Sequence, residues 1–225
     1  MILRSCLSFL TAAGLLACSR PDAARPAAEA SGAPEPPAVL VLGTSLAAGQ
    51  GIDPDQAYPA VLQRMIDSAG YEFRVLNRGV SGETSAGAAK RAAWLLQQPV
   101  AVLVLETGGN DGLRGLDPEA LRTNIQAVID LARGRDPAPQ ILLLGMEAPP
   151  NLGASYTSRF REAYREVARA NEIPMVPFVL EGVAGVDSLN QADGIHPTPE
   201  GHRRMAEIIW PALEPLLRSG VSRGG

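Results

Sequence analysis

Three residues of the chain have the side-chain types that nucleophilic chemistry requires. Ser45 follows Gly43 and Thr44 directly after an apolar run, at a turn that can hold a hydroxyl exposed and rigid. A serine hydroxyl is a weak nucleophile until a base removes its proton. His196 can act as that base, and Asp193, three residues earlier in the same loop, can hold the imidazole in the required tautomer. The pattern predicts a nucleophile, a base and an orienting carboxylate.

Attack by the Ser45 hydroxyl on a carbonyl would place negative charge on oxygen, and hydrogen-bond donors have to meet that charge. The predicted donors are the backbone N–H of Ser45, the backbone N–H of Gly82 and the side-chain amide of Asn110. Gly82 suits a close approach because it lacks a Cβ atom. Taken singly, Ser45 could cap a helix and Asn110 could form a turn. Their presence together with the base and the carboxylate favours catalysis.

The elements that position these residues alternate between strands and helices. The hydrophobic pattern predicts strands at 38–42, 71–76, 100–105, 141–144 and 174–178. It predicts helices at 56–69, 84–97, 118–133, 155–170 and 198–217. Such alternation is typical of an α/β domain with three layers, in which helices cover both faces of a parallel sheet. Three polar, Gly-rich segments follow strands, and a fourth, residues 193–197, precedes the last helix. We expect all four to meet at the carboxyl edge of the sheet.

Four segments of the sequence resemble, in order and in position, the sequence blocks of the SGNH (GDSL) hydrolases. Ser45 matches the serine of the first block, Gly82 the glycine of the second, Asn110 the asparagine of the third, and Asp193 with His196 the final pair. Within that superfamily, SGETS, LETGGNDGLRG and DGIHP look most like the periplasmic multifunctional thioesterase, arylesterase and lysophospholipase group. The resemblance implies a flavodoxin-like, five-stranded sheet of order 2-1-3-4-5. It also implies hydrolysis of acyl esters and thioesters, with no cofactor.

One position departs from the pattern of these hydrolases. Their first block usually reads Gly-Asp-Ser-Leu, and here Thr44 replaces the Asp. That Asp is not the carboxylate that orients the histidine, so we expect the core chemistry to survive with a reduced rate or altered loop mobility. The substitution also leaves open a non-catalytic envelope lipoprotein that has kept the fold.

Residues around these motifs are expected to support the site. Ala148, Pro149 and Pro150 lie in the loop that follows the fourth strand, and we predict that they form a wall for the acyl group. The remaining supporting predictions are a loop-bracing carboxylate at Glu106, structural support at Asp111, helix capping by Glu83 and Thr84, and a surface or capping position for His202.

The N-terminal segment reads as a targeting signal. Residues 1–17 combine Arg4 with a short apolar stretch, and Leu15 to Cys18 resembles a bacterial lipobox. We therefore predict a signal peptide at 1–17, lipidation of Cys18, an Ala/Pro-rich tether at 18–37, a hydrolase domain at 38–218 and a disordered tail at 219–225. The expected location is the bacterial cell envelope, facing the periplasm. Ser19 after the cysteine favours the outer membrane in a Gram-negative cell.

Composition excludes several other classes of function. The net charge of -4 argues against a nucleic-acid partner, which needs a basic face. The only cysteines are Cys6 and Cys18, and with two histidines in the chain we expect no metal site. Two alternatives remain open, namely O-deacetylation of sugars or peptidoglycan by the same layout, and a flavodoxin-type binding module with residues 43–51 around a phosphate.

Overall fold

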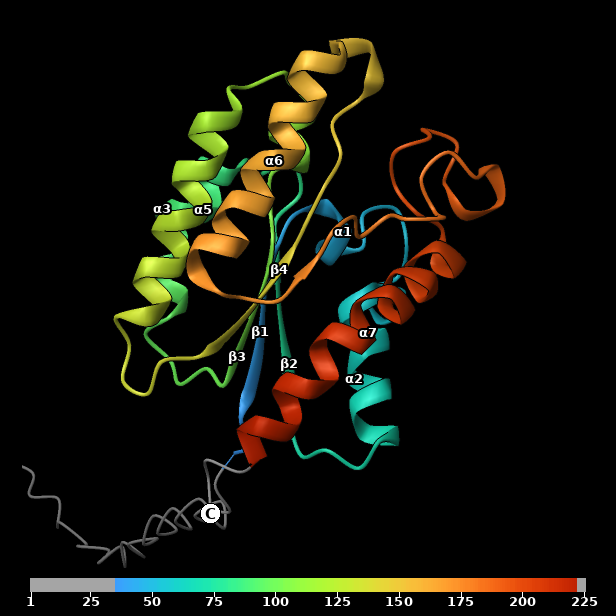
Figure 1. Cartoon of the computed structure of the whole chain (residues 1–225). Helices are drawn as coiled ribbons and strands as arrows, with labels where there is room; N and C mark the ends of the chain where they lie inside the picture. Colours follow the sequence, from blue (N-terminus) through green and yellow to red (C-terminus); the bar gives the residue numbers. More distant parts are fainter. Residues whose placement is uncertain (1–34, 222–225) are drawn as a thin grey trace, which may run out of the picture. The chain divides into compact units, whose positions relative to one another are not determined.

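The sheet has the predicted strand order. The computed structural model describes residues 35–221, and its five parallel strands lie in the order β2-β1-β3-β4-β5 (Figure 1). The predicted signal peptide, Cys18 and all but the last three residues of the tether lie outside the described residues and stay predictions. The strands are β1 (Ala38–Gly43), β2 (Arg74–Gly79), β3 (Val102–Glu106), β4 (Gln140–Leu144) and β5 (Met175–Val176).

Helices cover both faces of the sheet, which confirms the three-layer architecture. Helices α3 (Ser85–Leu95), α5 (Pro118–Arg133) and α6 (Ala154–Asn171) lie on one face, and α2 (Tyr58–Ser68) and α7 (Pro199–Val221) on the other (Figure 1). Helix α5 begins where the sequence predicted, because the Asp117 side chain accepts the Glu119 N–H at 3.1 Å and Pro118 occupies its first position. Its buried residues follow the helical period, with Leu121, Ile125 and Val128 facing the core.

The core is centred on the two inner strands. The side chains of Val39–Leu42 in β1 and of Val102–Leu105 in β3 are fully buried. A parallel strand with helices over both faces has no solvent side, so its apolar run is continuous. The loops that follow these two strands therefore begin from buried, well-packed positions.

Three predicted boundaries are corrected. Strand β2 runs from Arg74 to Gly79 instead of 71–76, because its register is set by pairing with β1, and as an edge strand it is only half-buried and carries a weak pattern. Strand β5 is reduced to two residues. Helix α7 continues to Val221, beyond the predicted domain end at 218, and Ser219 Oγ donates to Gln140 Oε1 of β4 at 2.9 Å.

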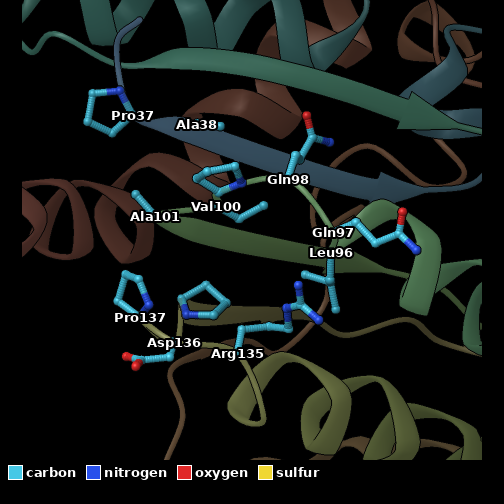
Figure 2. Close-up of a pocket in the computed structure, with 12 residues that line it drawn as sticks. Pro37, Ala38, Leu96, Gln97, Gln98, Val100, Ala101, Arg135, Asp136 and Pro137 are labelled. Atoms are coloured by element: carbon cyan, nitrogen blue, oxygen red, sulfur yellow. The ribbon is translucent and has the colours of Figure 1, made fainter. Parts of the chain in front are cut away.

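The two ends of the sheet differ in chemistry. At the amino ends of the strands, a cavity of about 390 Å³ lies among Pro37, the 96–101 segment and the 135–139 segment (Figure 2). Ligands of open parallel sheets bind instead at the carboxyl ends, where the predicted site residues lie.

Within residues 35–221, no helix combines the length and the apolar character that crossing a bilayer would demand.

Candidate active site

The three residues predicted to act on the substrate are in hydrogen-bond contact. His196 Nε2 lies 3.0 Å from Ser45 Oγ, and His196 Nδ1 lies 2.6 Å from Asp193 Oδ2. With the ring proton on Nδ1, the ring donates to the carboxylate and leaves Nε2 free to accept the serine proton. Ser45 and His196, 151 positions apart in sequence, are therefore within hydrogen-bond distance for proton transfer.

The loop that carries His196 is shaped by Asp193. The second carboxylate oxygen, Oδ1, accepts the backbone N–H groups of Ile195 at 2.9 Å and of His196 at 3.0 Å. Gly194 occupies the left-handed region at φ 68°, which lets the chain turn tightly between the two functional side chains. The hydrogen bond from the His196 ring, followed by those two amides, holds the pKa of Asp193 well below its usual range. Asp193 is thus ionised at neutral pH.

Gln191 connects the loop that carries His196 to the segment that follows Ser45. Its side-chain amide donates to Gln50 O at 2.8 Å and to Pro197 O at 2.9 Å, while its backbone N–H donates to His196 O at 2.7 Å. Gln50 lies two residues after the end of the short helix that begins at Ser45. Sequence reasoning missed Gln191, because no local pattern distinguishes a loop glutamine that bridges two segments 141 residues apart.

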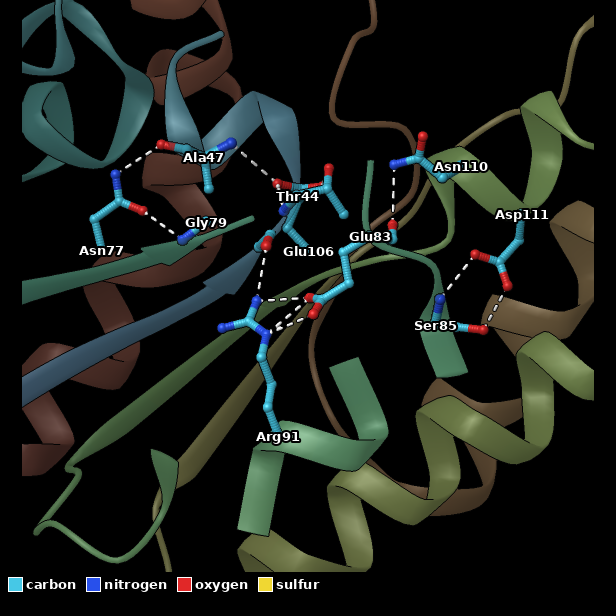
Figure 3. Close-up of polar contacts among 11 residues, drawn as sticks. Thr44, Ala47, Asn77, Gly79, Glu83, Ser85, Arg91, Glu106, Asn110 and Asp111 are labelled. Atoms are coloured by element: carbon cyan, nitrogen blue, oxygen red, sulfur yellow. Dashed lines mark hydrogen bonds and ion pairs between the residues drawn. The ribbon is translucent and has the colours of Figure 1, made fainter. Parts of the chain in front are cut away.

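Ser45 opens α1 (Ser45–Ala48), a four-residue helix that packs against β2. A Cβ atom on Gly79 would lie 2.2 Å from Ala48 N, so only glycine allows this approach. Asn77 Nδ2 donates to Ala47 O at 2.7 Å, and Asn77 Oδ1 accepts the Gly79 N–H at 2.9 Å (Figure 3). The turn that carries Ser45 is therefore held from the β2 side.

The three predicted oxyanion donors line one cavity with His196. Among the described residues, the Ser45 N–H, at the first position of α1, donates to no protein acceptor. Gly82 has φ 76°, and Asn110 lies in α4 (Gly109–Leu113). Asn110 Nδ2 gives one hydrogen to Glu83 O at 2.9 Å, which leaves its second hydrogen for a ligand (Figure 3).

Asn110→Ala is expected to lower kcat by roughly 10²- to 10³-fold, because that is the usual effect of removing one oxyanion donor. KM should change little, since an oxyanion donor would act on charge that develops only in the transition state. Steady-state hydrolysis of p-nitrophenyl butyrate gives both constants. Asn171→Ala, in the interface of α5 and α6, is the matched control. Equal kcat values in the two variants would contradict the assigned role.

Two buried carboxylates brace the loops, as the sequence predicted. Glu106, at the end of β3, accepts the Thr44 N–H, the Thr44 hydroxyl and the Ala47 N–H. Asp111 accepts the Ser85 N–H at 2.8 Å and the Ser85 hydroxyl at 2.5 Å, which joins the start of α3 to the Asn110 segment (Figure 3). Neither carboxylate contacts His196, so neither competes with Asp193.

The capping predicted for Glu83 and Thr84 is wrong. Thr84 precedes α3 at the N-cap position, but its side chain makes no capping hydrogen bond. The Glu83 carboxylate forms an ion pair with Arg91 at 2.7 Å, and Arg91 Nη2 also donates to Gly43 O at 3.0 Å. The guanidinium outcompetes the backbone amides for Glu83 because it offers several charged donors in one plane.

The surface position predicted for His202 is also wrong. Its side chain is buried, its Nδ1 accepts the Tyr58 N–H at 3.2 Å, and its ring stacks on the Tyr58 ring at a centroid distance of 6.4 Å. Burial, followed by the nearby His196, lowers the pKa of His202 to about 4. His202 is therefore a neutral core residue that joins α7 to the start of α2.

This burial predicts an acid-dependent loss of stability. The pKa of His202 is about 4 in the folded state, against 6.5 as its ordinary value, so the unfolded chain binds the proton more readily. The contribution of neutral His202 to the free energy of unfolding is fully present above pH 6.5. It is lost as the pH falls toward 4, and the total loss is about 3 kcal/mol. Urea unfolding of wild type and His202→Asn between pH 7.5 and 4.5 measures it. The variant should show the smaller pH dependence, and equal slopes would contradict the assignment.

The cavity beside Ser45 has a volume of about 510 Å³ and a largely apolar wall. Ala148, Pro149 and Pro150 belong to that wall, at the position predicted for them. Met146, at the start of the same predicted loop, also lines the cavity. Sequence reasoning missed the other apolar residues, since they come from separate segments without a shared motif; they are Leu46, Leu113, Phe178, Leu180, Ala184 and Ile195.

A doubly covered parallel sheet of order 2-1-3-4-5, with this array of residues at its carboxyl edge, defines the class of SGNH hydrolases. The chain belongs to the GDSL-like Lipase/Acylhydrolase family, whose model matches residues 41–204, and it is a carboxylic ester hydrolase.

Individual relatives cover most of the chain. It is 43% identical to Esterase TesA of Pseudomonas aeruginosa, over 80% of this chain and 89% of the relative. It is 32% identical to the Thioesterase 1/protease 1/lysophospholipase L1 of Escherichia coli K12, over 80% of this chain and 84% of the relative. The crystal structure of TesA superimposes with a TM-score of 0.76, at 43% identity, and covers 80% of this chain and 99% of that one.

Proposed function

We propose that the protein is a serine hydrolase that cleaves acyl esters through an acyl-enzyme on Ser45. The observation that carries this proposal is the continuous hydrogen-bond chain from Ser45 Oγ through the His196 ring to Asp193. A nucleophile, a base and an orienting carboxylate in direct contact are the arrangement that activates a hydroxyl for acyl transfer.

In acylation, Ser45 Oγ attacks the ester carbonyl carbon while His196 Nε2 takes the hydroxyl proton. The carbonyl oxygen becomes an oxyanion that the Ser45 N–H, the Gly82 N–H and the Asn110 amide stabilise. As the intermediate collapses, the bond to the leaving group breaks and His196 returns its proton to the departing alcohol. Asp193 stabilises the imidazolium throughout and remains ionised.

In deacylation the same groups act on water. His196 Nε2 takes a proton from water, the resulting hydroxide attacks the acyl carbon, and the Ser45 oxygen leaves with that proton. The products are a carboxylic acid and the regenerated serine. No step needs an additional reactant, because one water molecule supplies both the oxygen and the two hydrogens.

The cavity favours apolar acyl groups as substrates. Its volume lies within the range of small-molecule sites, and its wall offers aliphatic and aromatic carbon from Leu113, Met146 and Phe178. We propose short to medium acyl chains on aryl esters, thioesters and lysophospholipids. The names of the arylesterase of Vibrio mimicus and of the E. coli thioesterase and lysophospholipase are in keeping with this range. A sugar O-deacetylase would instead need polar groups along the wall.

Covalent labelling tests the proposed nucleophile. A fluorophosphonate should modify the wild-type protein once, and mass spectrometry of its peptides should place the adduct on Ser45. Labelling should be slow in His196→Ala, because the hydroxyl loses its base. Ser68, an exposed serine of α2, is the internal control and should remain unmodified. An adduct on another serine, or labelling that is indifferent to His196, would overturn the mechanism.

A further inference from the structure

The carboxylate of Glu106 is directed at the segment that carries the nucleophile. Its Oε2 accepts the Thr44 N–H at 2.9 Å and the Ala47 N–H at 3.2 Å, and its Oε1 accepts the Thr44 hydroxyl at 2.6 Å (Figure 3). These donors flank Ser45 on both sides. A carboxylate that holds the residues before and after the nucleophile determines where the Ser45 hydroxyl and N–H point.

The ionised form of Glu106 is the stronger acceptor for these three hydrogen bonds. A protonated carboxyl has an O–H of its own to place, and it is a weaker acceptor for the remaining donors. Glu106 is fully buried, at the end of an inner strand. Burial raises its pKa to about 7, although the hydroxyl and amide of Thr44 and the amide of Ala47 oppose that rise. Both protonation states are therefore accessible near neutral pH.

The charged and titratable groups around Glu106 come from three helices and from the loop that precedes α3. The Glu83 carboxylate raises the pKa of Glu106, and Glu83 is itself paired with Arg91 of α3. The hydroxyls of Tyr58 in α2 and Tyr164 in α6 face the same region, and burial raises the pKa of both, with a smaller contribution from the charge of Glu106. No cation is in contact with Glu106 within residues 35–221, so Thr44 and Ala47 are its stabilising partners.

Residue 44 is also where the chain departs from the Gly-Asp-Ser-Leu pattern. An aspartate here would bring a second carboxylate toward Glu106, and two such groups in one buried place share a proton. The threonine hydroxyl is neutral and donates to the carboxylate at 2.6 Å. The substitution therefore favours the ionised form of Glu106 in this chain.

We propose that Glu106 and Thr44 form a positioning pair that holds the Ser45 segment in its reactive geometry only while Glu106 is ionised. Protonation of Glu106 weakens its hydrogen bonds to the Thr44 and Ala47 amides and reverses the direction of its bond to the Thr44 hydroxyl, so that the Ser45 hydroxyl loses its alignment with His196 and with the oxyanion donors. The inference rests on the proposed function of Ser45 and adds that the ionisation of Glu106 controls the rate. Glu106 itself contacts no substrate and takes part in no bond change.

Thr44→Val and Thr44→Ser test the pair. Valine removes the hydroxyl and should move the acid limb of the kcat/KM profile to higher pH by about one unit, the equivalent of one hydrogen bond to a charged group. Serine keeps the hydroxyl and should restore the wild-type profile. Near pH 9, where Glu106 is ionised in each protein, valine and serine variants should have similar kcat. A loss in Thr44→Val that is the same at every pH would overturn the proposal.

Glu106→Gln provides a second, independent measurement. The neutral amide accepts through a single oxygen and more weakly than a carboxylate, so kcat should fall by roughly 10- to 100-fold, the cost of a small misplacement of reacting atoms. The acid limb of the kcat/KM profile should lose the ionisation of Glu106, which should remain in Asn171→Ala, a variant destabilised far from the site. A wild-type profile in Glu106→Gln would overturn the proposal. Wild-type activity in Ser45→Ala would instead remove the proposed function, and the inference with it.

Discussion

Ser45→Ala is expected to lower kcat for p-nitrophenyl butyrate by roughly 10⁴- to 10⁶-fold, the range found when the nucleophile of such a triad is removed. The hydroxyl at 3.0 Å from His196 Nε2 is the atom that would form the acyl bond. KM and the free energy of unfolding should change little, because Ser45 Oγ has no structural partner besides His196 among the described residues. Initial rates and urea unfolding curves measure these quantities.

The matched comparison is Ser68→Ala, the same change at an exposed serine that bonds only within α2. This variant should keep the wild-type kcat. The double variant Ser45→Ala/His196→Ala should be about as inactive as Ser45→Ala alone, since the base has no role without the nucleophile. Additive losses would show that the two residues act independently, and the mechanism would then be wrong.

The sequence predicted the parts of the fold that depend on local pattern. The inner strands β1 and β3 are unbroken apolar runs because both faces are covered, and such runs are recognisable without coordinates. The edge strand β2 was misplaced by three residues, because its half-buried positions leave no clear alternation and pairing with β1 sets its register. Local pattern therefore predicts the order of elements more reliably than the limits of an edge strand.

In the candidate site, too, some residues could be predicted from the sequence and others could not. The residues proposed to contact substrate lie in short polar segments after strands, so their positions in sequence pointed to one sheet edge. Their supports depend on contacts between distant residues, such as the bond from Tyr58 to His202, 144 positions apart. Histidine is polar by type, and its burial follows only from the packing of α2 on α7. Gln191 likewise has a role only once the loops have met.

The pair of Thr44 and Glu106 combines both kinds of information. The sequence drew attention to Thr44 because it departs from the usual first block, and to Glu106 because a carboxylate ends a buried strand. Their mutual contact, 62 positions apart, came from the structure. A departure from a family pattern is best interpreted through the residue that the replaced side chain touches.

Asp193→Asn is expected to lower kcat by roughly 10³- to 10⁴-fold, as the equivalent change does in other triads. An amide at this position can donate to His196 Nδ1, which would place the ring proton on Nε2 and leave no acceptor for the serine hydroxyl. The loss should persist at high pH, because it reflects the wrong tautomer and not protonation of the ring. The pKa of Asp193 is held well below its usual range, so the wild-type carboxylate provides no competing titration.

Asp187→Asn, in the nearby η3 segment (Asp187–Leu189), makes the same chemical change without contact to His196 and should retain wild-type kcat. In Asp193→Asn, the effect on the loop can be measured separately from the effect on the tautomer of His196. The asparagine Oδ1 can still accept the backbone N–H groups of Ile195 and His196. The folded loop should therefore persist, and ¹⁵N spectra of the His196 ring should report the proton on Nε2 in the variant and on Nδ1 in wild type. An unchanged tautomer together with an unchanged rate would mean that Asp193 shapes the loop without orienting the base.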